Sequence, residues 1–363
     1  MKILQIKYSL VSGGAERFVV DLSNELAYIG HHVYLATLLD DSINNNGFYN
    51  REISEKVNYI NLKLNKGFRL SNIYHLGKLI KSIKPDVVHC HQNLVNYIFP
   101  LSIVFSKIKF FHTTHNDAPK EVNSFLEYWL RKFFFLTEKV RAITISKETS
   151  KSFANYYRSN KYTEIYNGRK KPLPSEEYEQ VTKFIDKLRA KTKIIFLHIG
   201  RFAPQKNQEL LINVFNRLIN EGKPIVLLII GAGFDSEKGN RLKSIASNNI
   251  YFLGEKHNVT DYYLNSDAFC LSSIHEGMPI TLIEALACGC TPICTPVGGI
   301  CDTINNGSTG FLSESLSEDD FYNVLNLYLK QKDTISKDLL ITYYNSNFSI
   351  IECANQHVKL FNS

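Results

Sequence analysis

SSIHEGMPITLIEALACGCTP, at residues 272–292, has the pattern of a loop that leads into a helix. The apolar run at 268–271 just before it predicts a short buried strand. Pro279 suits the first residue of a helix, where its missing N–H costs nothing. The helix is expected to run from Ile280 to Ala287, and Gly289 stands where a helix ends. The stretch is therefore a strand–loop–helix unit of an α/β protein.

Two carboxylates in this stretch, Glu276 in the loop and Glu284 in the helix, are eight positions apart. Between them lie the amides of a helix N-terminus, which favour an anion. A carboxylate that accepts hydrogen bonds from hydroxyls, beside amides that hold a phosphate, is what a sugar nucleotide requires. An ordinary loop and helix with two surface glutamates explains these residues equally well.

Two other strand ends in the second half carry residues suited to a phosphate. The strand expected at 194–199 is followed by Arg201 and Lys206, just before a helix that opens near residue 208. Cations at such a position form a diphosphate clamp if a ligand is present, and are solvated surface charges if none is. The strand at 225–230 ends in Gly231, where a backbone can approach closely.

The first half opens with a strand at 2–6, a glycine pair at Gly13 and Gly14, a helix at 17–28 and a strand at 32–37. This order predicts a parallel α/β sheet. The glycine pair precedes a helix N-terminus and suits close approach of a ligand, although a tight turn without a ligand is as good an explanation. The loop is not GxGxxG, which disfavours a dehydrogenase.

Three histidines, His89, His91 and His115, stand at the carboxyl ends of two further strands. Ligands of open α/β sheets gather at this edge, so these side chains are expected to converge with the glycine pair on one crevice. A metal site is disfavoured because no acidic ligand pattern accompanies them. The sequence also contains no Asp-x-Asp triplet, so a metal-dependent sugar-nucleotide site of that kind has no candidate.

The composition, 44% hydrophobic and 21% charged over 363 residues, is that of a soluble globular protein with two domains. The Lys-, Pro- and Ser-rich segment near 170–179 is the best linker. No signal peptide and no run long enough to span a membrane is apparent. The seven cysteines form no paired framework, which indicates reduced residues of the core and a cytoplasmic protein.

Positive charge is concentrated in residues 1–170, which hold 24 Lys and Arg against 14 Asp and Glu, whereas the totals are 42 and 35. The excess suggests an anionic partner. No nucleic-acid motif appears, so an anionic membrane face or a phosphate-bearing acceptor fits better. The segment 125–140, with Trp129 and three consecutive phenylalanines, is expected to be a core helix or, alternatively, a basic aromatic helix on a membrane surface.

Taken together, these motifs identify a family. The chain resembles the retaining glycosyltransferases of family 4, group-1 transferases of the GT-B fold, over nearly its whole length. The resemblance implies two Rossmann-like domains whose parallel sheets face each other across a cleft. An acceptor-binding domain would span 1–172, a nucleotide-sugar donor domain 173–345, and a tail helix at 346–363 would pack back on the first domain. The motifs that carry it are SGGAERFVVDLSNELA, PDVVHCH, HTTHND, ITISKE, IYNG, GRFAPQKN, IIGAG, IYFLG, HEGMPITLIEALACGCTPI and GGICDTI.

The resemblance also implies roles for single residues. Glu276 and Glu284 match the E-x7-E pair, in which the first carboxylate faces the donor sugar and the second binds the nucleotide ribose. Arg201 and Lys206 match the cations on the donor diphosphate, and His115 matches a histidine that contacts the donor sugar. The implied catalytic set is Glu276, His115, Lys206 and Arg201. The implied donor-binding set is Gly13, Gly14, Arg201, Lys206, Gly231, Gly277, Met278, Pro279, Ile280, Thr281, Leu282 and Glu284.

The implied reaction moves a hexose or N-acetylhexosamine from a nucleotide sugar, most simply a UDP-sugar, to a glycan or lipid-linked acceptor in bacterial polysaccharide synthesis. Fixed cations and helix amides would stabilise the leaving diphosphate, so no metal or other cofactor is expected. Front-face attack and a covalent route through a carboxylate both stay open. The alternatives are an epimerase or phosphorylase on the same fold, and a sugar-nucleotide-binding scaffold without turnover. Acceptor choice is expected to lie in loops 40–70 and 116–130.

Overall fold

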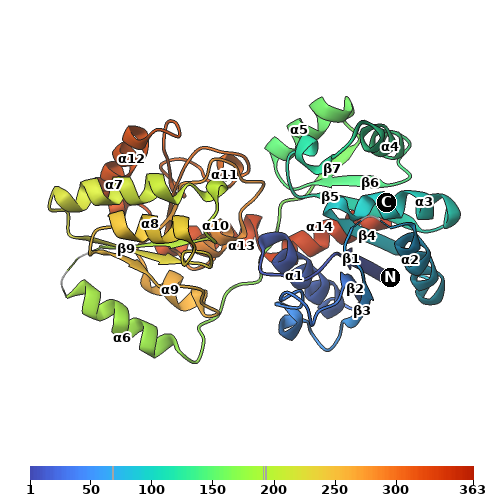
Figure 1. The fold of residues 1–363 in the computed structure, drawn as a ribbon, viewed down its shortest axis with the longest axis horizontal. Helices are drawn as coiled ribbons and strands as arrows, with labels where there is room; N and C mark the ends of the chain where they lie inside the picture. Colours follow the sequence, from blue (N-terminus) through green and yellow to red (C-terminus); the bar gives the residue numbers. More distant parts are fainter. Residues whose placement is uncertain (68, 191, 193) are drawn as a thin grey trace. The chain divides into compact units, whose positions relative to one another are not determined.

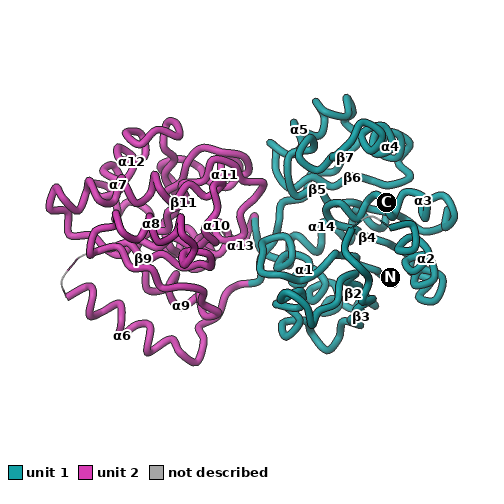
Figure 2. The backbone as a smooth tube through the Cα atoms, in the orientation of Figure 1, with its two compact units in different colours: residues 1–170, 348–363 teal, residues 171–347 magenta. Residues whose placement is uncertain are grey.

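The computed structural model describes residues 1–67, 69–190, 192 and 194–363, and it divides the chain into two compact α/β units (Figure 2). Unit 1 comprises residues 1–170 and 348–363, and unit 2 comprises residues 171–347. Each unit is built round one parallel β-sheet with its own hydrophobic core (Figure 1). The predicted fold class, two parallel-sheet α/β domains, is therefore confirmed.

Unit 1 holds a seven-stranded sheet in the order β3-β2-β1-β4-β5-β6-β7, and each neighbouring pair is parallel. Apolar runs form its central strands, so that Ile3, Leu4 and Ile6 of β1 are fully buried. The strands are β1 (Lys2–Lys7), β2 (His32–Leu39), β3 (Asn58–Leu64), β4 (Val87–His91), β5 (Lys109–Thr114), β6 (Arg141–Thr144) and β7 (Tyr162–Glu164).

The helices of unit 1 connect these strands, and the last helix of the chain joins them. Among them, α2 packs on α3 and α3 packs on α4, while α14 lies against α1. The chain enters α14 where the Arg169 amide donates to the Phe348 carbonyl at 2.9 Å and the Ile350 amide donates to the Arg169 carbonyl at 3.0 Å. The helices are α1 (Gly14–Tyr28), α2 (Leu70–Ile83), α3 (Val95–Val104), α4 (Phe125–Leu136), α5 (Lys147–Tyr157) and α14 (Ile350–Asn362), with single turns η1 (Asn50–Glu52), η2 (Gln92–Leu94) and η3 (Ala118–Glu121).

Unit 2 holds a six-stranded parallel sheet in the order β10-β9-β8-β11-β12-β13. Its strands are β8 (Ile194–Ile199), β9 (Ile225–Ile230), β10 (Ile250–Phe252), β11 (Ala268–Leu271), β12 (Thr291–Cys294) and β13 (Phe311–Leu312). Its helices are α6 (Tyr178–Arg189), α7 (Gln208–Asn220), α8 (Glu237–Ile245), α9 (Val259–Asn265), α10 (Ile280–Ala287), α11 (Ile300–Thr303), α12 (Glu318–Gln331) and α13 (Lys337–Asn347), with turns η4 (Pro204–Lys206) and η5 (Lys332–Thr334).

The strand order reverses between β1 and β4 in unit 1 and between β8 and β11 in unit 2. Loops that leave the carboxyl ends of strands at such a reversal diverge and open a ligand site. In unit 2 these are the loops after β8 and β11, and they carry Lys206 and Glu276. The topology thus brings together two motifs that are 70 residues apart.

Several local expectations need correction. Pro279 is the N-cap residue of α10, with extended backbone angles, and not its first helical residue. The sequence at 164–168, which includes the IYNG motif, predicts a strand, but β7 ends at Glu164. The sequence at 178–191 predicts a helix, and α6 occupies this stretch but ends at Arg189. Residue 191 lies outside the described residues, as does residue 68 of the segment 40–70.

Two further expectations concern membrane-spanning helices and the cysteines. No helix among them is both long enough and apolar enough to span a membrane. Six of the seven cysteines are buried, whereas Cys301 is exposed. The expectation that every cysteine is a core residue is therefore wrong at Cys301.

Candidate functional site

The centre of the candidate site in unit 2 is an ion pair between Lys206 and Glu276. The Lys206 Nζ atom lies 2.6 Å from the Glu276 Oε1 atom, and their side chains are 18% and 8% exposed. The Ser273 hydroxyl donates to the same oxygen, also at 2.6 Å. The pair thus joins the loop after β8 to the loop after β11, which the sequence alone could not show.

The two loops are also tied through their backbones. The Gln205 side-chain amide donates to the His275 carbonyl at 2.8 Å, and the Ile274 amide donates to the Gln205 carbonyl at 2.9 Å. The Ser272 hydroxyl lies 3.0 Å from the carbonyl oxygens of both Lys206 and Asn207. Because these bonds surround the ion pair, Lys206 is held by its own turn as well as by Glu276. Sequence reasoning did not assign Ser273 or Gln205 to the site.

A third loop, after β12, supports Glu276 from behind. A Cβ atom on Gly298 would lie 1.7 Å from the Glu276 carbonyl oxygen, and the φ angle of Gly298 is +52°. The next amide, of Gly299, donates to the Gly277 carbonyl at 2.8 Å. Only glycine fits this close approach. The GG motif near 298 was recognised in the sequence, but its contact with the Glu276 backbone was not.

Helix α10 begins at the end of the same loop. Glu276 and Glu284 are each 6% exposed, and the side chains of Met278, Ile280 and Leu282 are buried. The Thr281 Oγ1 atom is buried and has no hydrogen-bond partner among the described residues. A buried hydroxyl without a partner is uncommon, and at a helix N-terminus it suits a bound anion.

Arg201 and Gly231 do not reach the ion pair in this structure. The Arg201 side chain is exposed and forms no ion pair within the described ranges. Gly231 has a packing role, because a Cβ atom there would lie 2.1 Å from the Gly200 carbonyl oxygen. The Phe202 amide also donates to the Ala232 carbonyl at 2.8 Å. The loops after β8 and β9 therefore touch through their backbones, which explains this glycine without a ligand.

In unit 1, the predicted histidines do come together at the strand ends. The His91 Nδ1 atom lies 3.1 Å from the His115 Nε2 atom, and the His91 Nε2 atom lies 3.0 Å from the Gln5 Oε1 atom. His89 instead contacts the Thr113 hydroxyl at 2.7 Å. All three imidazoles are buried, so they line the core under the edge of the sheet and do not project into an open crevice.

Burial sets the charge of these imidazoles. It lowers the pKa of His91 and of His115 well below the usual range, and the positive charge of Lys7 lowers both further. They are therefore neutral at neutral pH, where they donate and accept hydrogen bonds. Within the described part of the chain, no group of three or more His, Cys, Asp or Glu side chains is arranged to hold a metal ion.

The glycine pair begins α1, with Gly13 as the N-cap residue and Gly14 as the first helical residue. A Cβ atom on Gly13 would lie 2.4 Å from the Glu16 Oε2 atom, whose carboxylate folds back over the turn. The other Glu16 oxygen lies 3.0 Å from the Nζ atom of Lys7, which is fully buried. Burial lowers the pKa of Lys7. Sequence reasoning missed this buried Lys7–Glu16 pair.

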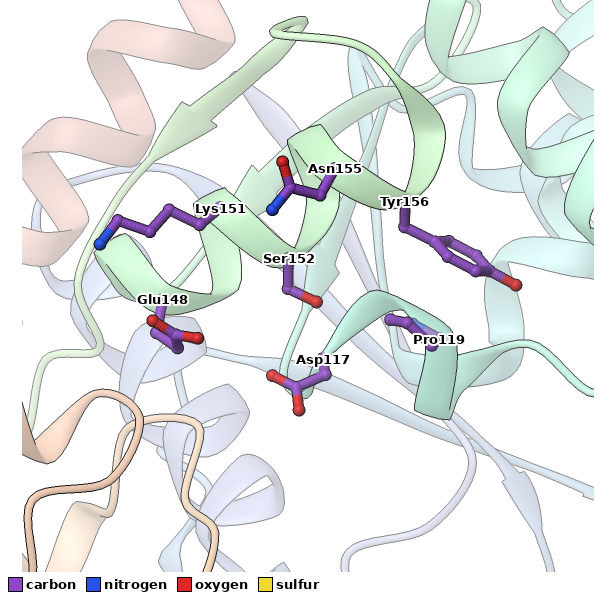
Figure 3. A pocket seen from close by; sticks show the side chains of 7 residues that line it. All are labelled: Asp117, Pro119, Glu148, Lys151, Ser152, Asn155 and Tyr156. Atoms are coloured by element: carbon purple, nitrogen blue, oxygen red, sulfur yellow. The ribbon is translucent and has the colours of Figure 1, made fainter. Parts of the chain in front are cut away.

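Unit 1 also has an open cavity of about 490 Å³ between η3 and α5. In Figure 3 the side chains of Asp117, Ser152 and Glu148 lie round this hollow, and the Tyr156 ring lies at its other end. The Ala118 amide donates to the Ser152 hydroxyl at 3.0 Å and ties η3 to the helix. Its lining residues are Asp117, Pro119, Glu148, Lys151, Ser152, Asn155 and Tyr156.

Comparison with known proteins covers both units. The family model "Glycosyltransferase Family 4" matches residues 12–170, and "Glycosyl transferases group 1" matches residues 180–342. An Escherichia coli UDP-Gal:alpha-D-GlcNAc-diphosphoundecaprenol alpha-1,3-galactosyltransferase is 26% identical over 278 residues, 70% of this chain and 69% of that protein. The Staphylococcus aureus capsular polysaccharide biosynthesis glycosyltransferase CapH is 26% identical over 308 residues, 78% of each chain.

Among solved structures, that of Anabaena HepE in complex with UDP and glucose is similar to this chain with a TM-score of 0.79. The match covers 100% of this chain and 99% of HepE, at 17% identity. At that identity the likeness establishes the fold. It leaves the ligand of this chain to be argued from its own residues.

Proposed function

The chain belongs to the group-1 glycosyltransferases of the GT-B fold, and from this premise we propose that it is a retaining family 4 enzyme that uses a UDP-sugar. The transferred group is a hexose or N-acetylhexosamine, and the acceptor is a glycan or a lipid-linked sugar of bacterial polysaccharide synthesis. The observation that carries the proposal is the Lys206–Glu276 contact at 2.6 Å, placed at the reversal of strand order in unit 2.

Unit 2 binds the donor in this proposal. The amides at the start of α10, from Ile280 to Leu282, hold the diphosphate, and the Thr281 hydroxyl supplies a further donor. Glu284 accepts hydrogen bonds from the ribose. Gly277, Met278 and Pro279 complete the loop that leads to these amides. The HepE structure, with UDP and glucose, supports UDP as the nucleotide by analogy of fold.

Lys206 is proposed to stabilise the leaving group. When the bond between the anomeric carbon and the phosphate oxygen breaks, negative charge builds on that oxygen, and a fixed cation lowers the energy of this state. Arg201, which is exposed, is proposed to bind the same diphosphate. The acceptor oxygen bonds to the anomeric carbon on the same face, and its proton passes to the leaving phosphate. This chemistry needs no metal, and none is proposed.

The other residues of the proposed site contact the sugar and the acceptor. Glu276 hydrogen-bonds the transferred sugar while it holds Lys206 in place. His115 contacts the sugar in this proposal once its imidazole, which is buried against His91 in this structure, turns outward. Because burial lowers its pKa, it then serves as a neutral hydrogen-bonding group. Gly13 and Gly14 are proposed to let an anionic group approach the N-terminus of α1, over which the Glu16 carboxylate folds in this structure.

For the acceptor, we propose the cavity between η3 and α5 of unit 1 (Figure 3). Asp117, Glu148 and Asn155 offer oxygen and amide groups to sugar hydroxyls, and the Tyr156 ring offers an apolar face. Asp117 and Pro119 belong to loop 116–130, where acceptor choice was expected from the sequence. The E. coli relative, whose name includes a diphosphoundecaprenol-linked sugar, supports a lipid-linked acceptor.

A lipid-linked acceptor would place the enzyme at the inner face of the cell membrane, and α4 offers a surface for this. Its outer side exposes Phe125 by 78%, Leu126 by 69%, Trp129 by 50% and Phe133 by 57%. Monomeric soluble proteins seldom expose so many large apolar side chains together. Lys132, whose Nζ atom lies 5.2 Å from the centroid of the Trp129 ring, adds positive charge to the patch.

The exposed side of α4 supports the proposal that segment 125–140 also meets a membrane surface. Phe134 and Phe135 of α4 belong to the hydrophobic core of unit 1, so one side of the helix packs on the core while the other side is exposed. The basic excess of residues 1–170 favours a bilayer with anionic lipid as the occupant of the exposed side. We therefore extend the proposal to peripheral attachment through α4.

The test of the transfer activity begins with a thermal-shift panel of nucleotide sugars, followed by mass analysis of the product made from the best donor with and without acceptor. Stabilisation by UDP-sugars and a glycosylated acceptor are expected. A product that forms without acceptor would indicate an epimerase, and phosphate-dependent release of sugar phosphate would indicate a phosphorylase. Binding without any product, under all acceptor conditions, would leave a scaffold without turnover and overturn the proposal.

A further inference from the structure

Glu121, at the end of η3, is buried at 4% exposure although it carries a carboxylate. Its Oε1 atom accepts hydrogen bonds from the backbone amides of His115, at 3.0 Å, and Asn116, at 3.2 Å. These are the first two amides beyond β5, which ends at Thr114. The carboxylate therefore caps the end of this strand and holds the backbone from which the His115 side chain projects.

The second oxygen of Glu121 faces the interior of unit 1. Its Oε2 atom lies 3.5 Å from the His112 Nε2 atom and 3.6 Å from the Arg131 Nη1 atom. Burial lowers the pKa of His112, so Arg131 is the cation that balances this carboxylate at neutral pH. Arg131 is 1% exposed and is itself held by Glu127 at 2.6 Å. The carboxylate that caps the end of β5 thus belongs to a buried network of charged side chains, formed by Glu121, Arg131 and Glu127.

The single turn η3, which ends at Glu121, also forms one wall of the cavity between η3 and α5. Asp117 and Pro119 of this turn line the cavity (Figure 3). Glu121, at the end of the turn, is buried. The Ser152 hydroxyl holds the Ala118 amide from the side of α5 at 3.0 Å. One buried carboxylate therefore restrains both His115 and the cavity edge.

We propose that Glu121 is a positioning residue for sugar transfer. It acts through the backbone amides of His115 and Asn116, holds the backbone that carries the His115 imidazole and sets the wall formed by Asp117 and Pro119. Glu121 does not touch the sugar. The importance of His115 rests on the proposed function, whereas the restraint of the two amides rests on the geometry alone.

Glu127 provides a matched control. It pairs with the same Arg131 and is also a carboxylate of unit 1, but its Oε2 atom accepts from the Asn123 amide at 2.9 Å and it does not contact the amides after β5. A purely structural role through Arg131 would make Glu121→Gln and Glu127→Gln behave alike. A positioning role separates them.

The experiment measures amide hydrogen exchange of peptides that cover 111–118, in the full-length protein without ligand. In Glu121→Gln we expect the His115 and Asn116 amides to exchange at least roughly tenfold faster, because the bonds to an ionised acceptor are weakened. Glu127→Gln should leave them within about twofold of the wild type. Should Glu121→Gln fail to fold, Glu121→Asp replaces it, since it keeps the charge but is one methylene too short to reach both amides. Unchanged exchange in the variant, or equal acceleration in Glu127→Gln, would overturn the proposal.

A kinetic measurement tests the consequence for the reaction. With the best UDP-sugar, Glu121→Gln should lower kcat by roughly 10- to 100-fold and leave the Kd for UDP unchanged, because UDP is held by unit 2. A kcat equal to that of the wild type would contradict positioning. If the wild type transfers no sugar at all, the proposed function fails, while the exchange measurement still decides whether Glu121 restrains this segment.

Discussion

The Lys206–Glu276 pair yields the sharpest prediction, and the change that tests it is Lys206→Ala. A unit charge about 4 Å from a developing oxyanion contributes about 4 kcal/mol at an effective dielectric constant near 20. The leaving oxygen gains only part of a charge in the transition state, and Glu276 offsets part of the lysine field. We therefore expect a loss of about 2–3 kcal/mol of transition-state stabilisation, or a roughly 30- to 160-fold fall in kcat.

The same change also removes a partner from a buried carboxylate. Glu276 would keep the Ser273 hydroxyl at 2.6 Å but lose the cation. Such a loss costs about 1–3 kcal/mol of folding free energy, which lowers the melting temperature by a few degrees without unfolding the protein. Circular dichroism and a melting curve therefore accompany the kinetics.

A matched control comes from the same unit. Lys243 and Asp235 form an ion pair of the same length, 2.6 Å, but their side chains are 33% and 97% exposed and lie outside the loops after β8 and β11. Lys243→Ala should change kcat by less than about twofold, since exposed pairs contribute little. The assay is UDP release together with mass analysis of the product at saturating donor. If Lys206→Ala kept kcat within about threefold of the wild type, the charge argument would be refuted.

Three further predictions concern other parts of the molecule. Gly298→Ala should lower the free energy of unfolding by at least about 2 kcal/mol and remove most of the activity, because its Cβ would overlap the Glu276 carbonyl. Gly222→Ala is the control, since Gly222 has a φ of +78° but open space around it, so this variant measures the backbone strain alone. Equal losses of stability in the two variants, measured by urea unfolding, would contradict the overlap. Burial lowers the pKa of His357 to about 4, so its contribution to stability is present above pH 6.5 and is lost as the pH falls toward 4. His357→Gln should reduce the difference in unfolding free energy between pH 7 and pH 5 by about 2 kcal/mol, and an unchanged difference would disprove this assignment. The double variant Phe125→Ser and Phe133→Ser should no longer float with vesicles of anionic lipid, whereas Leu173→Ser, at a similarly exposed leucine of unit 2, should still float. Two results would argue against lipid as the occupant of this surface: a wild type that does not bind vesicles at low salt, or a wild-type dimer that becomes a monomer in the double variant.

Local chemistry explains which elements were predictable. Pro279 precedes α10 and Gly289 follows it, so both ends of this helix were predictable. Three short, continuously apolar runs predict buried strands and not surface helices, namely 194–199, 225–230 and 268–271. The structure has all four elements at the expected residues. The helices α12 and α13 were not expected. The periodic signal of α13 is weak, whereas α12 begins with a Ser317 cap and an acidic first turn, signals that could have identified it.

The identities of the candidate residues came from motifs, but their contacts did not. Lys206 and Glu276 were singled out separately, and only the adjacency of β8 and β11 brings them within 2.6 Å. His91 and His115 were expected to meet in a crevice, and they meet in the core instead. Glu121 and Lys7 carried no motif at all, because a buried charge is recognisable only from its surroundings.

The sequence by itself determined the class of the fold, the family and the residues of the candidate site. These follow from apolar periodicity, from glycine and proline at loop positions and from spacings within one strand–loop–helix unit, all of which are local. The tertiary structure alone decided which loops touch, which charges are buried and which face of α4 stays exposed. The physical reason is that strand order and helix packing depend on contacts between distant residues, whose free energies are set when each sheet assembles as a whole.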